Sequence, residues 1–143
     1  MPPEYVRRIE AGYRMSVTDR GRDQAMRTAV SDAVQGAVDA YDFLITPTVS
    51  AMQVDNSDDG DTVGPSEVAG VTVEPLIGWC MTYFLNFSGH PAASIPAGMV
   101  DGKFPVGMQI IGGRYDDPGV LTASRVFEQL RPWADAYELC RTR

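Results

Sequence analysis

The stretch from residue 86 to residue 113 limits the possible folds most. Glycine and proline interrupt it throughout, and within it only Asp101 and Lys103 carry a formal charge. Two short apolar runs flank Asp101-Gly102, and an Asp-Gly pair between apolar runs favours a tight hairpin turn. After the turn, apolar residues alternate with others as they do on a strand, at Val106, Met108 and Ile110. The stretch therefore predicts two strands joined by a tight turn.

Two prolines restrict the pairing of these strands. Pro96 and Pro105 have no backbone N–H and cannot donate to the hydrogen-bond ladder of a sheet. Each of them must therefore lie at the end of a strand, at a bulge or at the edge of the sheet.

Two amphipathic helices are predicted in the first part of the chain. Between residues 22 and 41, apolar residues recur at spacings of three and four, while charged and amide residues occupy the other side. A weaker version of the same period covers residues 5–13. Thr18 or Asp19 lies between these segments and is the expected N-terminal cap of the longer helix.

The middle of the chain holds three segments of different character. Residues 42–48 form a short apolar run that stops at Pro47, and we expect a buried strand in the centre of a sheet. Residues 55–70 are acidic and rich in glycine, which indicates an exposed loop without regular structure. Residues 74–89 are dense in aromatic and aliphatic side chains, which predicts a buried helix or helical turn ending near Asn86.

A last helix completes the predicted order of elements. Asp116 and Asp117 lie near its start, where the helix dipole favours anions. Its apolar face consists of Val120, Ala123, Phe127 and Leu130. Helices followed by strands with helices between them predict an α/β class with a mixed sheet, and residues 1–143 are expected to form a single domain.

Charge and cysteine content narrow the possible partners and the cellular location. The net charge of −7, from 19 acidic against 12 basic side chains, repels phosphate backbones and anionic bilayers, so we expect no nucleic acid and no membrane partner. The first residues lack the apolar core of a secretion signal. Cys80 and Cys140 are spaced neither as a metal motif nor as a disulfide framework, which favours reduced thiols in the cytoplasm.

Candidates for catalysis are few. A serine–histidine relay would have to use His90, the only histidine in the sequence, with Ser88 as the nucleophile. Their spacing lacks the strained turn that exposes a nucleophile, so we interpret His90 as a polar group at the rim of a loop. Lys103, the only lysine, follows the predicted turn, where an exposed ammonium stays hydrated and charged and does not serve as a base.

Metal and cofactor sites find no support in the sequence. Asp55, Ser57, Asp59 and Gly60 match four positions of a calcium-binding loop, but Ser66 stands where that loop needs its bidentate glutamate. We therefore interpret the segment as a solvated acidic loop. One histidine and two distant cysteines cannot form a metal cluster, and no nucleotide-binding glycine motif occurs, so no cofactor and no metal are expected.

Three blocks in order, YDFLITPT, NFSGHPAASIPAG and DGKFPVGMQIIGGRYDD, followed by a helix with SRVFEQ, closely resemble the C-terminal part of the amidase signature family. Enzymes of this family hydrolyse or transfer carboxamide groups. The resemblance extends from about residue 5 to about residue 130. It rests on the combination of matching positions: Asp42, Pro47, Thr48, Asn86, Gly89, Pro91, Pro96, Ala97, Gly98, Gly102, Pro105, Gly107 and Gln109.

The resemblance implies a large α/β domain with a mixed central sheet packed between helices. It also implies a catalytic lysine, a cis-serine and a nucleophilic serine in a G-G-S-S-G-G stretch. That stretch does not occur in this sequence, in which the serines are isolated, so no catalytic residue can be assigned to this chain. By the same resemblance, Thr48, Asn86 and His90 are expected in the wall of the substrate pocket.

Three hypotheses about function follow. In the first, the chain is the C-terminal portion of an amidase-type hydrolase and is inactive alone, so that a small-molecule amide is its substrate only when the catalytic part is supplied. In the second, it is a non-catalytic subunit that completes a split amidase or amidotransferase, or it associates with itself through bare sheet edges. In the third, it is a free-standing ligand-binding module.

Overall fold

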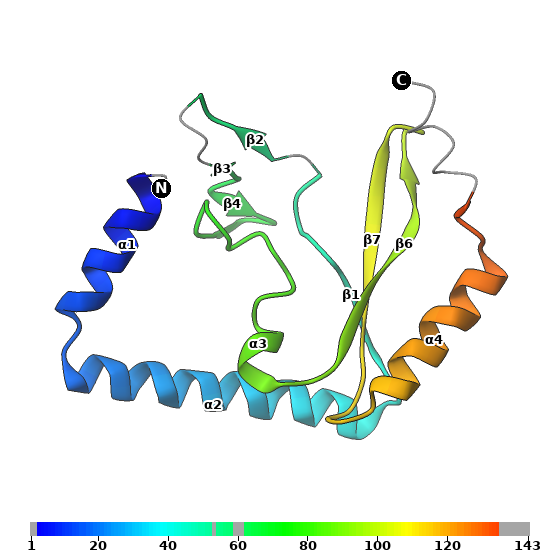
Figure 1. Cartoon of the computed structure of the whole chain (residues 1–143), viewed down its shortest axis with the longest axis horizontal. Coiled ribbons are helices and arrows are strands. Elements are labelled where there is room, and N and C mark those ends of the chain that lie inside the picture. Colours follow the sequence, from blue (N-terminus) through cyan, green and yellow to red (C-terminus); the bar gives the residue numbers. More distant parts are fainter. Residues whose placement is uncertain (1–2, 53, 59–61, 135–143) are drawn as a thin grey trace.

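The computed structural model describes residues 3–52, 54–58 and 62–134. Two helices at the start are followed by short strands, a strand hairpin and a last helix, which confirms the α/β class (Figure 1). The helices are α1 (Pro3–Arg14), α2 (Val17–Ala40), α3 (Leu85–Ser88) and α4 (Asp117–Leu130). The strands are β1 (Leu44–Pro47), β2 (Asp55–Asn56), β3 (Thr62–Val63), β4 (Glu67–Val68), β5 (Val71–Thr72), β6 (Ala92–Val100) and β7 (Phe104–Ile111).

The predicted hairpin is confirmed and forms most of the main sheet. β6 and β7 pair antiparallel, and Asp101 and Gly102 in the turn between them have φ angles of 53° and 63°. Both angles are positive, as the tight turns typical of Asp-Gly require. The register shifts between Pro96 and Gly98, so Pro96 lies at an irregularity of the ladder, as its missing N–H demands.

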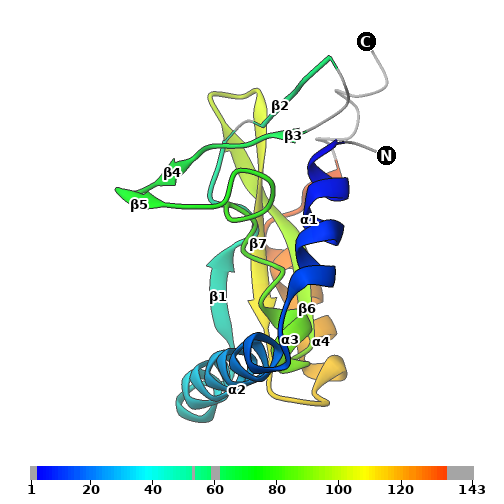
Figure 2. The same ribbon diagram turned by 90° about the vertical axis from the view of Figure 1, so that its left-hand side faces the viewer.

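The prediction that residues 42–48 form a buried central strand is wrong. The three strands lie in the order β1-β7-β6, so β7 is in the middle and β1 is at an edge, with Ile45 51% exposed (Figure 2). The reason is the hairpin: β6 already occupies one side of β7, and β1 pairs antiparallel along the other. All strand pairs in the described residues are antiparallel.

One end of the sheet packs against α2 and α3. Leu44 and Ile111 lie directly opposite each other and therefore share a face of the sheet. Ile111 forms a buried cluster with Val34 of α2 and Leu85 of α3, and Leu44 packs against this cluster. In both views α2 crosses beneath this end of the sheet (Figures 1 and 2).

The other face of the sheet is covered by α4. Ile110 points away from Ile111 because side chains alternate along a strand, and it is only 3% exposed. α4 contacts both β6 and β7. Gly112, two residues after Ile110, lies so close to this helix that an added Cβ would be 2.7 Å from Val120 Cγ2. The absence of a side chain at Gly112 therefore permits the close approach of α4.

The caps of the long helices are local hydrogen bonds. Ser16, rather than Thr18 or Asp19, is the N-cap of α2, so this helix begins earlier than predicted. The Ser16 hydroxyl accepts from the Asp19 N–H, and the Asp19 carboxylate accepts from the Ser16 N–H, each at 3.1 Å. This reciprocal pair is a capping box. At α4 the expected acidic start is confirmed, because the Asp116 carboxylate accepts from the Gly119 N–H at 3.0 Å.

Two segments in the middle differ from expectation. We expected residues 55–70 to lack regular structure, but among its described residues β2 pairs with β3, and β4 pairs with β5, which follows directly. Ala69 and Gly70 both have positive φ angles, which closes the second pair into a tight turn. Residues 75–79 and 81–84 form turns on either side of Cys80, which bridges to Val49, and the short α3 follows, which confirms the helical turn. The expected burial is only partial, since Ile77 and Phe87 are 46% and 41% exposed.

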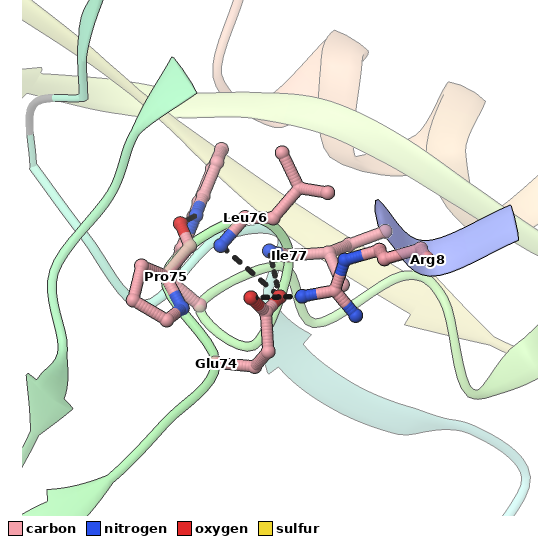
Figure 3. Close-up of polar contacts among 6 residues, drawn as sticks. Arg8, Glu74, Pro75, Leu76 and Ile77 are labelled. Carbon is pink, nitrogen blue, oxygen red and sulfur yellow. Dashed lines mark hydrogen bonds and ion pairs between the residues drawn. The ribbon is translucent and has the colours of Figure 1, made fainter. Parts of the chain in front are cut away.

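Glu74 organises the turns that precede α3. Its Oε2 atom accepts from the backbone N–H groups of Leu76 at 3.0 Å and of Ile77 at 3.1 Å, and its other oxygen pairs with Arg8 of α1 (Figure 3). In the same turn, Trp79 Nε1 donates to the Pro75 carbonyl at 3.0 Å. One carboxylate thus satisfies two backbone donors and joins α1 to this segment.

We expect the two contacts of Glu74 to differ in energy. The ion pair is partly exposed, so Glu74→Gln should lower the free energy of unfolding by less than about 1 kcal/mol. Glu74→Ala also removes the acceptor of two N–H groups and should cost about 1–3 kcal/mol in urea unfolding. Glu10→Ala, which removes an exposed pair with Arg14 on α1, is the matched control. Equal losses for the two Glu74 variants would show that the ion pair dominates instead.

Candidate functional site

A row of uncharged polar side chains crosses the sheet face that also carries Leu44 and Ile111. Thr46 of β1 and Ser94 of β6 lie directly opposite Gln109 of β7, one on each side of it. Gln109 is only 2% exposed, and its Nε2 group donates to Thr46 Oγ1 and to the Met81 carbonyl, each at 3.0 Å. A buried amide with these partners attaches both β1 and the segment before α3 to the middle strand.

A pair of hydroxyl groups lies at the next position along the same face. Thr48, just beyond β1, and Ser94 approach each other with their oxygen atoms 2.6 Å apart. Thr48 is held by its backbone, because its N–H donates to the Gly107 carbonyl and its carbonyl accepts from the Met81 N–H, each at 3.0 Å. An added Cβ at Gly107 would lie 2.6 Å from Thr48 Oγ1, so the missing side chain leaves room for the hydroxyl pair.

His90 is buried, so the expectation of a polar group at a loop rim is wrong. The side chain is 5% exposed, and its Nε2 atom lies 3.1 Å from Oε1 of Gln35 on α2. Gln35 in turn donates from Nε2 to the Asp39 carboxylate at 2.8 Å. The segment entering β6 packs against α2 closely enough to cover the imidazole, which the sequence pattern alone did not reveal.

This chain of hydrogen bonds fixes the tautomer of His90. A carboxylate only accepts, so the amide nitrogen of Gln35 faces Asp39 and the amide oxygen faces the imidazole. His90 Nε2 must therefore carry the proton and donate. His90 Nδ1 is left as a buried lone pair without a hydrogen-bond partner in the described residues.

A serine–histidine relay is not formed. The Ser88 hydroxyl donates to the Leu85 carbonyl at 3.4 Å within α3 rather than to the imidazole. Lys103 lies in the exposed hairpin turn, as expected from the sequence. No group of three possible metal ligands occurs within the described residues, and Asp59, Gly60 and Cys140 lie outside them. None of the helices that the structure describes is long and apolar enough to cross a membrane.

An open groove of about 690 Å³ runs between α2 and the residues before and within α3. Tyr83, Phe84 and Phe87 line one side, and α2 side chains line the other. The Arg27 guanidinium lies 5.1 Å from the centre of the Phe87 ring, within the range of a cation–π contact. The groove is therefore aromatic on one side and cationic at this contact.

The structure places the three predicted wall residues apart. Thr48 lies on the polar row of the sheet, Asn86 is exposed on α3, and His90 is buried against α2. Within the described part of the chain, no hydrogen bond joins any two of them, and none of them lines the groove. Ser94 and Gln109 were missed as site residues, because only the strand register shows that they lie beside Thr46 and Thr48.

Comparison with known proteins gives one consistent result. The family model described as Amidase matches residues 2–121. An acylamidase of Rhodococcus erythropolis is 33% identical over 123 residues, which cover 85% of this chain and 25% of that protein. One subunit of the glutamyl-tRNA(Gln) amidotransferase of Pseudothermotoga lettingae is 34% identical over 116 residues, covering 79% of this chain and 22% of that protein.

Solved structures agree with the sequence matches. The crystal structure of a bacterial aryl acylamidase, described as an amidase signature enzyme, is 46% identical with a TM-score of 0.93. That match covers 100% of this chain and 29% of the other. The corresponding glutamyl-tRNA(Gln) amidotransferase subunit of Thermotoga maritima is 27% identical with a TM-score of 0.59, covering 91% and 27%. The chain thus spans about a quarter of the length of the relatives it matches.

Stability should depend on pH through His90. Burial lowers the pKa of His90 below its usual value of 6.5, the Arg114 guanidinium lowers this pKa further, and the Asp39 carboxylate acts in the opposite direction. The unfolded chain therefore binds a proton more readily than the folded chain. The stability contributed by the neutral imidazole is fully present above about pH 6.5 and is lost as the pH falls below it.

Urea unfolding at about pH 7.5 and about pH 5.5 measures this effect. When one proton is involved, the free energy of unfolding cannot change by more than about 1.4 kcal/mol per pH unit. Because His90 is the only histidine, His90→Gln should flatten the pH dependence over this interval. An unchanged slope in that variant would assign the titration to carboxylates instead.

Proposed function

Because the chain belongs to the amidase family, we propose that it forms the C-terminal wall of the substrate site of an amide hydrolase, with aryl amides as the substrate class. The observation that carries this proposal is the likeness to the aryl acylamidase, at 46% identity over the whole chain with a TM-score of 0.93. Catalysis is proposed to need a nucleophile from sequence outside these residues, since the chain spans about a quarter of its relatives.

The polar row supports a binding role of this kind. Its side chains are uncharged, and a neutral carboxamide is recognised by groups that donate and accept hydrogen bonds without a charge. Thr48 and Asn86 are proposed as wall residues, because each has a side chain that is at least partly accessible. His90 is proposed to hold the segment behind the wall, since it is buried against Gln35.

A second candidate function is that of a separate subunit that completes a split enzyme. Two observations favour it: several relatives are named as one subunit of an amidotransferase, and β1 is an edge strand with Ile45 half exposed. Exposed strand edges favour pairing with a further strand, from another chain or from a second copy. In either case we propose a cytoplasmic location, in line with the cysteine content.

A chimeric enzyme tests the proposed function. In the aryl acylamidase, the region that matches this chain, 29% of its length, is replaced by residues 1–143. The chimera should release arylamine from an anilide with a kcat/KM within about a hundredfold of the intact relative, which allows for small misplacement of the substrate. The purified chain alone, and the relative truncated before the replaced region, should release none.

The outcome is decisive when folding is checked in parallel. A chimera that unfolds cooperatively and elutes like the intact relative, yet hydrolyses no anilide, would contradict the proposal. Hydrolysis by the purified chain alone would contradict the part that places the nucleophile elsewhere. Activity restored by mixing the truncated relative with this chain would favour the split-enzyme alternative.

A further inference from the structure

We propose that Ser94 and Thr48 together bind the carboxamide group of the substrate, one hydroxyl donating to its carbonyl oxygen and the pair accepting from its N–H. This inference rests on the proposed function and specifies which atoms of the wall make the contact. Ser94 was not among the residues expected from the sequence. Its assignment comes from the distance of 2.6 Å between the two hydroxyl oxygens.

The hydroxyl pair has unused hydrogen-bonding capacity. Two hydroxyls offer two O–H donors and four lone pairs, and the bond between them uses one donor and one lone pair. Neither hydroxyl makes another hydrogen bond within the described residues. One donor and several lone pairs therefore remain, which matches a carboxamide that presents a carbonyl acceptor and an N–H donor.

The neighbouring polar groups are less accessible to a ligand than Ser94. Gln109 is buried, and its amide group already donates to Thr46 and to the Met81 carbonyl. Ser94 is exposed and Thr48 is partly exposed. Of the polar side chains in this row, Ser94 alone is exposed, so the hydroxyl pair is its most accessible part.

The position of the pair is fixed by the backbone. Thr48 and Ser94 come from chain segments on opposite sides of β7, and Thr48 is hydrogen-bonded to Gly107 of that strand. Gly107 has no side chain to cover the hydroxyls, and an added Cβ would be within 3.1 Å of both. A pair held in this way needs little reorganisation when a ligand binds.

The arrangement also selects against a carboxylate of the same shape. A carboxylate has only acceptor atoms, and the pair has a single O–H left to give. Within the described residues, no cationic side chain makes a hydrogen bond to either hydroxyl. A neutral carboxamide should therefore bind in preference to the carboxylate that its hydrolysis releases, which would favour release of product.

A titration followed by NMR tests the inference on the chain itself. Benzamide added to the ¹⁵N-labelled chain should shift the backbone amide signals of Thr48, Ser94 and Gly107, and benzoate should shift them less. Ser94→Ala and Thr48→Val should each weaken benzamide binding about threefold to tenfold, the range for loss of one neutral hydrogen bond. Gly107→Ala should weaken it as well, because the added methyl group displaces the hydroxyls.

Two matched controls remove hydroxyls that are already satisfied. Ser124 and Thr122 donate to carbonyls of their own helix, α4, so Ser124→Ala and Thr122→Val should leave benzamide binding unchanged. Benzamide shifts confined to the groove beside Phe87, no shifts at all, or equal affinity for benzoate would overturn the inference.

The chimera separates this inference from the proposed function. There, Ser94→Ala should raise KM for an anilide about threefold to tenfold with a smaller change in kcat, since the contact already exists in the bound substrate. An inactive chimera would contradict the proposed function, while the NMR titration would still decide whether the pair binds an amide. An active chimera in which Ser94→Ala leaves KM unchanged would overturn only the inference.

Discussion

The buried amide of Gln109 is the contact on which the sheet and its surroundings depend. It lies on the middle strand, and its two hydrogen bonds reach Thr46 of β1 and the carbonyl of Met81. Leaving such a donor unsatisfied in the interior would cost about 1–3 kcal/mol, so both partners are held in place. The edge strand and the segment leading to α3 are thereby attached to the hairpin by one side chain.

The positions of the hydroxyl pair and of α3 follow from this contact. Met81 also donates from its backbone to the Thr48 carbonyl, so the segment before α3 is fixed to the end of β1 as well. α3 then packs Leu85 against Val34 and Ile111, which closes the core at the opposite end of the same face. The candidate binding face is therefore built by polar contacts in its middle and apolar contacts at its end.

The sequence predicted which helices and strands form better than it predicted which of them lie beside one another. The hairpin was predictable because Asp101-Gly102 favours one kind of turn, and the helices were predictable because their apolar residues have a clear period. The edge position of β1 was not, because nothing within residues 42–48 reveals that β6 takes the other side of β7. The place of Ser94 beside Thr48 was not predictable for the same reason, since it depends on strand register.

The single histidine has a consequence for how this protein can be studied. Its imidazole is enclosed between α2 and the segment that enters β6. The Nε2 atom is hydrogen-bonded to Gln35, and the Nδ1 atom has no hydrogen-bond partner in the described residues. Since no other histidine contributes, the histidine ring signals in a simple proton spectrum all come from this position. They form an intrinsic reporter of whether α2 is docked, and they need no isotope label.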